Sequence, residues 1–477
     1  MKRQVPCSGY KSEFDLYWRD QNSVVERNAR QRKKSPNKAD LEHRLPQHMI
    51  RSSIESSLAL PKPLPQDLEG YALSFFFPSY IFTQRDLGDQ QGFLTFLYPV
   101  YVASPPSSPL LPTVTAVALC LLEAWSFLRP GKPHSASRKH YTLGVNALRK
   151  RLAGNEPIGD DVLLATLMLD MYENICSFSN AQPYSTLHTH GTIAMMGNSK
   201  RLRLTNALSQ KVLLNARNQI VGKAFRSSAA LASSFGSWKE MAPDIPDIAT
   251  LPGFMLDELN IKVANLQAKA EVLRLDDRTS IPTPIILELQ RRAFALDQEL
   301  LEWSFNLPPG WAPRRIMLPA IPASVRAAGV YREHCNIHKS IFSANMWNFF
   351  STSRIKLQLI VLSCLQNLHD ENLEEYAALS KLIIQDQAED ICDNLPFFLG
   401  DRLEAHRFDN HVATYPWIEG EEVPVKHIQA AAAYAGWHLM AKLQELLSPR
   451  VPVSPETKAW IKGQVLRIKR IYYLGSS

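Results

Sequence analysis

Apolar residues repeat with helical spacing along most of the chain, and this periodicity limits its fold more than any other feature. In residues 160–178 the i, i+3, i+4 pattern is carried by Leu164, Leu167, Met168, Met171 and Ile175. The same spacing predicts helices at residues 113–128, 137–152, 256–275, 283–303, 328–368, 372–394, 427–447 and 455–472. Because no run of alternating strands joined by hairpin turns is found, we predict an all-α fold with one large multi-helix domain.

Composition excludes several other classes of chain. The 477 residues are 45% hydrophobic and 21% charged, which is unlike a collagen, a pure coiled coil or a fully disordered protein. Only 20 residues are glycine, which is few for a large doubly wound nucleotide-binding enzyme. Proline is frequent, at 32 residues, so we expect helices joined by proline-rich loops.

Residues 90–122 contain no charged side chain and resemble a membrane span in hydropathy. Prolines interrupt this stretch at Pro99, Pro105, Pro106, Pro109 and Pro112, and the uninterrupted part, residues 113–122, is short. A bilayer helix needs about 20 mainly apolar residues. We therefore predict a buried loop leading into a helix, and no membrane partner.

The positive charge is concentrated at the N-terminus. The net charge is +7, and residues 1–51 hold twelve Lys and Arg against six acidic residues. The densest part contains Arg27, Arg30, Arg32, Lys33 and Lys34. Such a run contacts phosphate or serves as a nuclear-import signal, although a solvated tail is the equal alternative. Phosphate contacts alone would give weak DNA binding without sequence preference.

The six cysteines are spread along the chain, and no two have CxxC spacing. The first residues are polar and basic, so we predict no signal peptide and reduced thiols in an intracellular compartment. Cys120, Cys364 and Cys392 lie in apolar helical surroundings. We expect these three to pack in the core as small hydrophobic residues.

Sequence motifs of common enzymes are absent: the chain has no GxxxxGK[ST], GxGxxG, GxSxG or HExxH. His334 and His338 have the i, i+4 spacing of two metal ligands on a helix, but the pattern offers no third ligand, so we expect ordinary helix surface. His188 and His190 would face different sides of a helix. We expect packing or helix-entry roles for them.

Two pairs of adjacent acids, Asp160 with Asp161 and Asp276 with Asp277, are candidates for general acid–base chemistry. Adjacent acids near helix ends more often cap the helix or oppose its dipole, and we predict this role. An α-helical enzyme of terpenoid type would need extended aspartate-rich metal motifs, which these pairs lack. We therefore predict no catalytic residues and no enzymatic activity.

The opening residues form a more specific pattern, with CSGYKSEFDL at positions 7–16 and WRDQ at 18–21. Four further fragments follow: LLATLMLDMYE (163–173), HTHGTIAMM (188–196), NMWNFFSTSR (345–354) and DICDNLPFFLG (390–400). The opening resembles the tail of a fungal binuclear zinc-cluster DNA-binding domain, in which the sixth cysteine precedes a Gly-Tyr pair. The other fragments resemble that family's helical regulatory domain, in the expected order.

The cysteines depart from the family pattern. A binuclear cluster holds two zinc ions with six closely spaced thiolates, and here Cys7 alone stands where the sixth ligand is expected. We therefore predict no zinc cluster and no cofactor, and expect zinc only if upstream residues with CxxC repeats exist. Autonomous sequence-specific DNA binding should then be weak or lost, since the groove-reading helix is missing as well.

The resemblance implies a nuclear transcription regulator that forms homodimers or heterodimers with related regulators. The expected domains are a zinc-cluster tail with a basic arm at 1–45, a linker at 46–70 and a helical regulatory domain at 71–477. Trp347 and Arg354 are expected to be helix-packing landmarks rather than a site. An adaptor that does not contact DNA is the main alternative, and an α-helical enzyme is the more distant one.

Overall fold

The structure is a computed structural model, and it describes residues 67–81, 93–125, 135–180, 187–197, 201–203, 206–227, 231, 251–273, 281–368, 373–404 and 413–472. Contacts divide the chain into Met1–Gln66 and Asp67–Ser477, and every described residue belongs to the second unit. The predicted arm at 1–45 lies outside the described residues, as does the linker at 46–70 up to residue 66. Helix α4 already starts at Leu68, where the Asp67 side chain accepts a hydrogen bond from the Gly70 amide.

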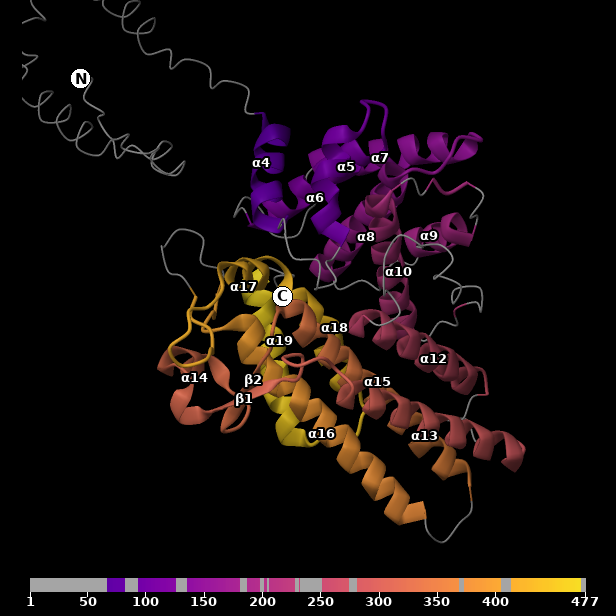
Figure 1. The fold of residues 1–477 in the computed structure, drawn as a ribbon, viewed down its shortest axis with the longest axis vertical. Coiled ribbons are helices and arrows are strands. Elements are labelled where there is room, and N and C mark those ends of the chain that lie inside the picture. The colour runs from indigo at the N-terminus through magenta and orange to yellow at the C-terminus, as the bar shows by residue number, and fades with distance from the viewer. Residues whose placement is uncertain are drawn as a thin grey trace, which may run out of the picture. The chain divides into compact units, whose positions relative to one another are not determined.

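The first group of helices surrounds α6 (Figure 1). Its members are α4 (Leu68–Tyr80), η2 (Phe93–Phe96), α5 (Leu97–Ala103), α6 (Leu110–Trp125), α7 (Ser135–Ala153), α8 (Asp160–Asn180), α9 (Leu187–Gly197) and α10 (Ala207–Ser227). Helix α6 contacts α4, α7 and α8, and Val114, Val117 and Leu121 are buried among them. This contact on several sides explains why residues 113–122 carry no charge.

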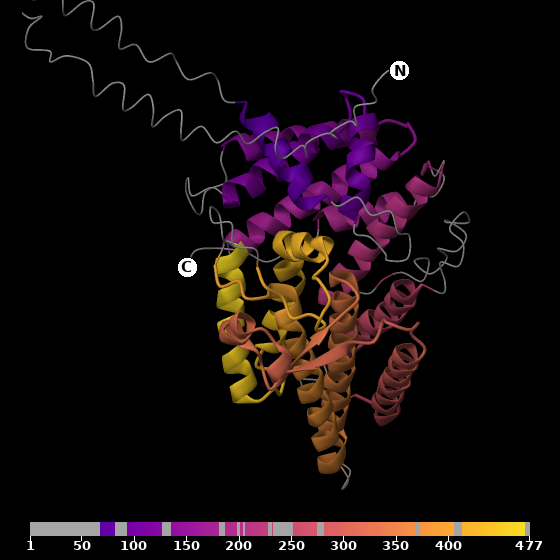
Figure 2. The same ribbon diagram turned by 60° about the vertical axis from the view of Figure 1, so that its left-hand side comes forward.

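The second group is built on two long helices that run side by side, α15 (Ile341–Asn367) and α16 (Leu373–Leu399) (Figure 2). Helices α12 (Pro252–Val272) and α13 (Thr283–Phe305) pack on α15. Ser340 caps α15 by accepting a hydrogen bond from the Ser343 amide, while Ser343 Oγ accepts one from the Ser340 amide. The Trp347 indole packs edge-on against Trp303, with ring centroids 5.6 Å apart.

The C-terminal helices pack against α16 and close a second apolar core. They are α17 (Val425–Ala430), the π-helical turn η7 (Ala431–Ala435), α18 (Gly436–Leu446) and α19 (Pro455–Tyr472). Gly436 opens α18 at a point where a side chain would overlap the Tyr472 ring. This glycine therefore lets α18 and α19 approach closely.

One short antiparallel sheet corrects the predicted helix at 328–368. Strand β1 (Arg314–Met317) pairs with β2 (His334–Ile337), and η6 (Leu318–Ala320) and α14 (Ala323–Gly329) connect them. Gly329 ends α14 at a φ of +124°, a backbone conformation that residues other than glycine rarely adopt. The predicted continuous helix is therefore wrong before Ile341, because its first part contains a helix end and a strand.

The all-α prediction is confirmed: helices dominate the described residues, and their strands form one two-stranded sheet. Helices α13 and α19 start at the predicted residues, whereas the predicted set omits α4, α5, α9, α10 and α14. The loop predicted ahead of the helix at 113–128 is largely helical in its described part, since η2, α5 and the first turn of α6 all precede residue 113. Pro112 is tolerated there because it stands in that first turn. Within the described ranges, no helix is both long and apolar enough to cross a bilayer.

Candidate functional site

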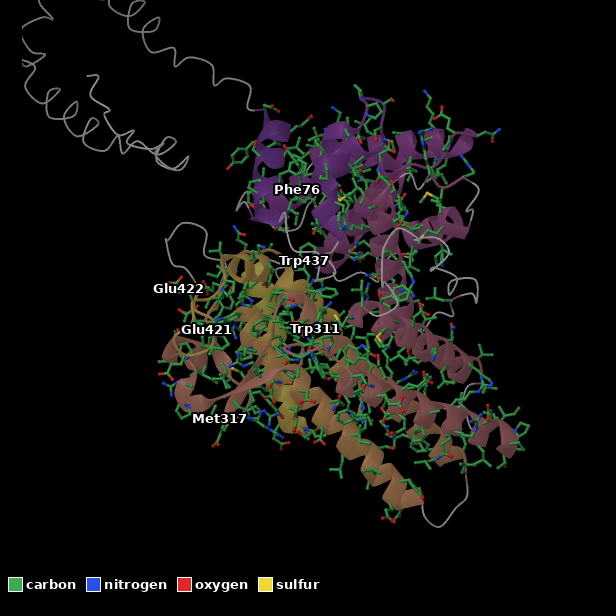
Figure 3. The ribbon with its side chains drawn as sticks, viewed as in Figure 1. Phe76, Trp311, Met317, Glu421, Glu422 and Trp437 are labelled. Atoms are coloured by element: carbon green, nitrogen blue, oxygen red, sulfur yellow. The ribbon has the colours of Figure 1, made fainter. Side chains whose placement is uncertain are left out.

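A small cavity lies where α10, α15 and α18 meet. It measures about 70 Å³, which is room for a few water molecules or one small ion. It is lined by Phe225, Arg226, Phe349, Thr352, Trp437, His438, Ala441, Lys442 and Glu445. Trp437 is labelled in Figure 3. Because the walls come from distant parts of the sequence, the cavity forms only when these helices are packed.

Lys442 is the central charged group of this cavity. Its Nζ donates to Asn345 Oδ1 and to the His438 carbonyl oxygen, each at 3.0 Å, and lies 4.0 Å from the centroid of the Phe349 ring. Burial, helped by the nearby Arg226, lowers the pKa of Lys442 to about 7. The ammonium is therefore near its titration midpoint at neutral pH, and an anion beside it would favour the charged form.

A second lysine lies against the cavity wall. Lys356 is 2% exposed, and its Nζ donates to the Phe225 carbonyl oxygen at 2.9 Å and lies 3.0 Å from Glu445 Oε1. Glu445 also lines the cavity, so Lys356 offsets its negative charge from behind. Arg226 and Lys442 line the same cavity as Glu445.

The other walls are apolar or neutral. Phe225 and Phe349 meet edge to face, with ring centroids 5.8 Å apart, and Trp437 closes another side. Burial lowers the pKa of His438 to about 3, so this imidazole is neutral at physiological pH. Excess positive charge between aromatic rings suits a small anion with an apolar part.

Helix periodicity explains why α18 supplies so much of the cavity. His438, Lys442 and Glu445 are spaced by four and three residues and so share one face of the helix. The apolar residues Leu439, Met440 and Leu443 point to the core instead. The amphipathic pattern of α18 therefore turns its polar face toward α10 and α15.

The two histidines of the segment 334–338 do not form a metal pair. They lie on and just after a strand rather than on the expected helix surface, which is a correction to the sequence prediction. His334 Nε2 is 2.8 Å from Asp393 Oδ2, and His338 Nε2 is 2.9 Å from Asn394 Oδ1. Burial lowers the pKa of His338 to about 4, so this ring is a neutral, enclosed residue.

His188 and His190 point to different surroundings on α9, as the sequence predicts. His188 is buried, with Nε2 3.0 Å from Glu173 Oε1 and 3.2 Å from the Tyr141 hydroxyl, whereas His190 is exposed. Across the ranges that the structure describes, no group of three or more His, Cys, Asp and Glu side chains could hold a metal ion.

The acid pair at 160–161 stands in the first turn of α8, where negative charge suits the helix dipole. Ser209 Oγ donates to Asp160 at 2.8 Å, and Ser108 Oγ donates to Asp161 at 2.7 Å. These bonds tie α8 to α10 and to the start of α6. Asp276 and Asp277 lie outside the described residues, as do Cys7, Arg27, Arg30, Arg32, Lys33 and Lys34.

The cysteines predicted for the core are buried there. Cys364 and Cys392 are fully enclosed and Cys120 is 7% exposed, each within a different apolar cluster. Trp347 Nε1 donates to the Trp311 carbonyl oxygen at 2.8 Å, and Arg354 forms an ion pair with Asp297. Both residues thus connect α15 to its neighbours.

The prediction from the sequence did not include the cavity residues. A usable signal exists, because Lys356 stands between Ile355 and Leu357 inside the long apolar helix α15, where a buried charge needs a partner. The sequence alone does not show that Lys356, Lys442 and Arg226 meet. No protein-family model, no curated protein and no solved structure matches this chain.

Proposed function

We propose that this protein is a nuclear transcription regulator of the fungal zinc-cluster type whose helical body responds to a small anionic effector. The effector would occupy the cavity between α10, α15 and α18. A carboxylate or phosphate group would lie beside Lys442 and Arg226, and an apolar part would pack on Phe225, Phe349 or Trp437.

One observation supports the effector: the buried Lys442 faces the cavity beside Arg226 and donates hydrogen bonds to two neutral oxygen atoms. A buried cation is costly unless a negative charge pairs with it, so an anion bound beside Lys442 would relieve that cost. An anion there would also bridge helices from the first group (α10) and the second (α15) and the C-terminal α18. Binding would thereby change how firmly these helices are held together, which is what a regulatory domain requires.

The transcriptional role is supported by the sequence resemblance and by the basic run that contains Arg30 and Lys33. This run would direct nuclear import and add salt-dependent phosphate contacts. Promoter specificity would come from a dimer with a related regulator. Chromatin occupancy of the tagged protein, with and without such a relative, tests this part of the proposal.

The effector site is tested by titrating the full chain with sodium acetate, with acetamide as an uncharged probe of similar shape. We expect acetate to raise the melting temperature and to change tryptophan fluorescence, and acetamide to do neither at equal concentration. Lys442→Met should abolish the response to acetate. Lys462→Met, which removes an exposed lysine of α19, is the matched control and should respond like the wild type. Equal responses to the two probes would rule out an anion site.

An adaptor that regulates without contacting DNA is the second candidate. The observation that favours it is the position of the cysteines, since the five that follow Cys7 all lie in the helical body. Binding of short DNA duplexes at low salt distinguishes a DNA-binding regulator from an adaptor. Affinity that falls steeply with added salt supports the regulator, whereas no binding at low salt supports the adaptor.

A further inference from the structure

Two cysteines that are far apart in the sequence meet between α6 and α8. Cys120 belongs to α6 and is buried, and Cys176 belongs to α8 and is half-buried. The helices pack directly on each other, and both residues join the same apolar cluster. Both thiols are reduced in the structure.

The two sulfur atoms are not equivalent. A hydrogen bond joins the Cys120 and Cys176 thiols, and the Tyr172 hydroxyl forms a second one with the Cys176 sulfur. These bonds lower the pKa of Cys176, although burial and the carboxylates of Glu123 and Glu173 oppose them. The same hydrogen bond, together with burial, raises the pKa of Cys120. Cys176 is also the more exposed of the two thiols, so it is the one that an oxidant in solution reaches first.

The surroundings hold Tyr172 in place for this role. Its ring stacks on Tyr141, with centroids 4.7 Å apart, and the Tyr141 hydroxyl donates to Glu173 Oε1 at 2.6 Å. Tyr172 is fixed from α7 on one side and precedes Cys176 by one turn on α8. The hydroxyl that stabilises a Cys176 thiolate is thus pre-positioned by packing.

We propose that Cys120 and Cys176 form an oxidation site that reacts with hydroperoxides and closes to a disulfide between α6 and α8. In the first step the Cys176 thiolate attacks the peroxide oxygen, the O–O bond breaks, and water or an alcohol leaves after taking up a proton. Cys176 becomes a sulfenic acid. In the second step the Cys120 sulfur attacks it, the S–O bond breaks, and water leaves with the Cys120 proton. Two thiols are oxidised and one peroxide is reduced.

The other described cysteines lack this combination. Cys335, Cys364 and Cys392 are fully enclosed, and burial raises the pKa of each thiol, to about 12 for Cys335 and Cys364. Cys176 is the half-buried thiol among those in the described ranges. Oxidation should therefore be selective for this pair.

The test treats the full-length protein with hydrogen peroxide and analyses it by peptide mass spectrometry without reduction. We expect one cross-linked species that joins the Cys120 and Cys176 peptides, and thiol titration should lose two of the six thiols. In Cys120→Ser, dimedone should trap a sulfenic acid at Cys176. In Cys176→Ser neither product should form, and thiol loss should slow at least tenfold. Cys364→Ser is the matched control and should keep the cross-link.

Alkylation rates of the wild-type protein give a second test, which does not depend on whether the cysteine variants fold. Iodoacetamide should alkylate Cys176 at least tenfold faster than Cys364, and Tyr172→Phe should reduce that ratio because one hydrogen bond to the thiolate is lost. Absence of the Cys120–Cys176 cross-link would overturn the proposal. So would alkylation of Cys176 no faster than that of Cys364, or a sulfenic acid that forms on Cys120 first.

Discussion

Arg354 of α15 reaches Asp297 of α13 with two parallel hydrogen bonds, Nε to Oδ1 at 2.8 Å and Nη2 to Oδ2 at 3.1 Å. Asp297 is 5% exposed, and Gln358 Nε2 also donates to it, at 3.4 Å. The pair therefore fixes the register of two long helices whose remaining contacts are mostly apolar. Its geometry is the paired fork that arginine forms with a carboxylate.

Breaking this pair should be strongly destabilising. In Asp297→Asn the guanidinium of Arg354 loses its counter-charge while it stays largely buried, and we expect a loss of about 3–5 kcal/mol in the free energy of unfolding. Urea denaturation measures it. Glu288→Gln, which affects an exposed ion pair with Arg291, is the control and should change little. If the urea midpoint of D297N equals that of E288Q, the Arg354–Asp297 pair does not fix the register of α13 and α15.

Gly436 should not tolerate a side chain. A Cβ there would lie 2.2 Å from the Tyr472 ring, whose hydroxyl donates to the Ala431 carbonyl oxygen, so the ring has little freedom to move. Gly436→Ala should cost about 1–3 kcal/mol of stability through overpacking. Gly463→Ala on α19 meets open space and should instead stabilise the helix by up to about 1 kcal/mol. Thermal unfolding of the two variants should shift in opposite directions.

The sequence predicted those helices best whose ends are marked locally. Residues 455–472 match α19 at both ends, since Pro455 starts the helix and Lys469 and Arg470 suit its last turn. Helix α10 was missed because Gln210, Asn215 and Arg217 are buried and disturb the apolar period. Strand β2 was missed because its partner, β1, is distant in sequence and each strand has only four residues.

The candidate site was less predictable than the fold for a related reason. Helix periodicity puts His438 and Lys442 on one face, but only tertiary packing brings that face to Arg226 and Phe349. Likewise, Cys120 and Cys176 show no spacing motif and meet only because α6 packs on α8. Spacing rules find sites within one helix or loop, whereas both of these sites lie between helices.

Asp393 should make stability depend on pH. Burial raises its pKa from 3.8 to about 7, although Arg315 and Arg332 oppose this. The folded state then binds more protons than the unfolded state between about pH 4 and 7. This contribution to stability is fully present below about pH 4 and is lost as pH rises through about 7. Its slope is at most about 1.4 kcal/mol per pH unit.

The measurement compares urea unfolding at pH 5 and pH 7.5 for the wild type, Asp393→Asn and Asp386→Asn. Between pH 5 and pH 7.5 the free energy of unfolding should fall more in the wild type than in D393N, because D393N lacks the titrating carboxyl group. Asp390 shifts in the same direction, with its pKa raised to about 6, so some dependence should remain. Asp386 is exposed and only adds to the raised pKa of Asp390 behind burial and Asp393, so D386N should flatten the slope much less than D393N.

Anion binding should weaken above pH 7, because Lys442 loses its proton there. Its pKa is about 7 in the empty cavity, and a bound anion would raise that value, so binding takes up a proton above pH 7. The charged groups that face it are Arg226, Lys356 and Glu445. Acetate, which stays ionised throughout, should bind with nearly constant affinity from pH 6 to 7 and then weaken, by at most about tenfold per pH unit. Lys462→Met should follow the wild-type curve in calorimetric titrations, and affinity that stays level or rises up to pH 8.5 would show that Lys442 does not hold the anion.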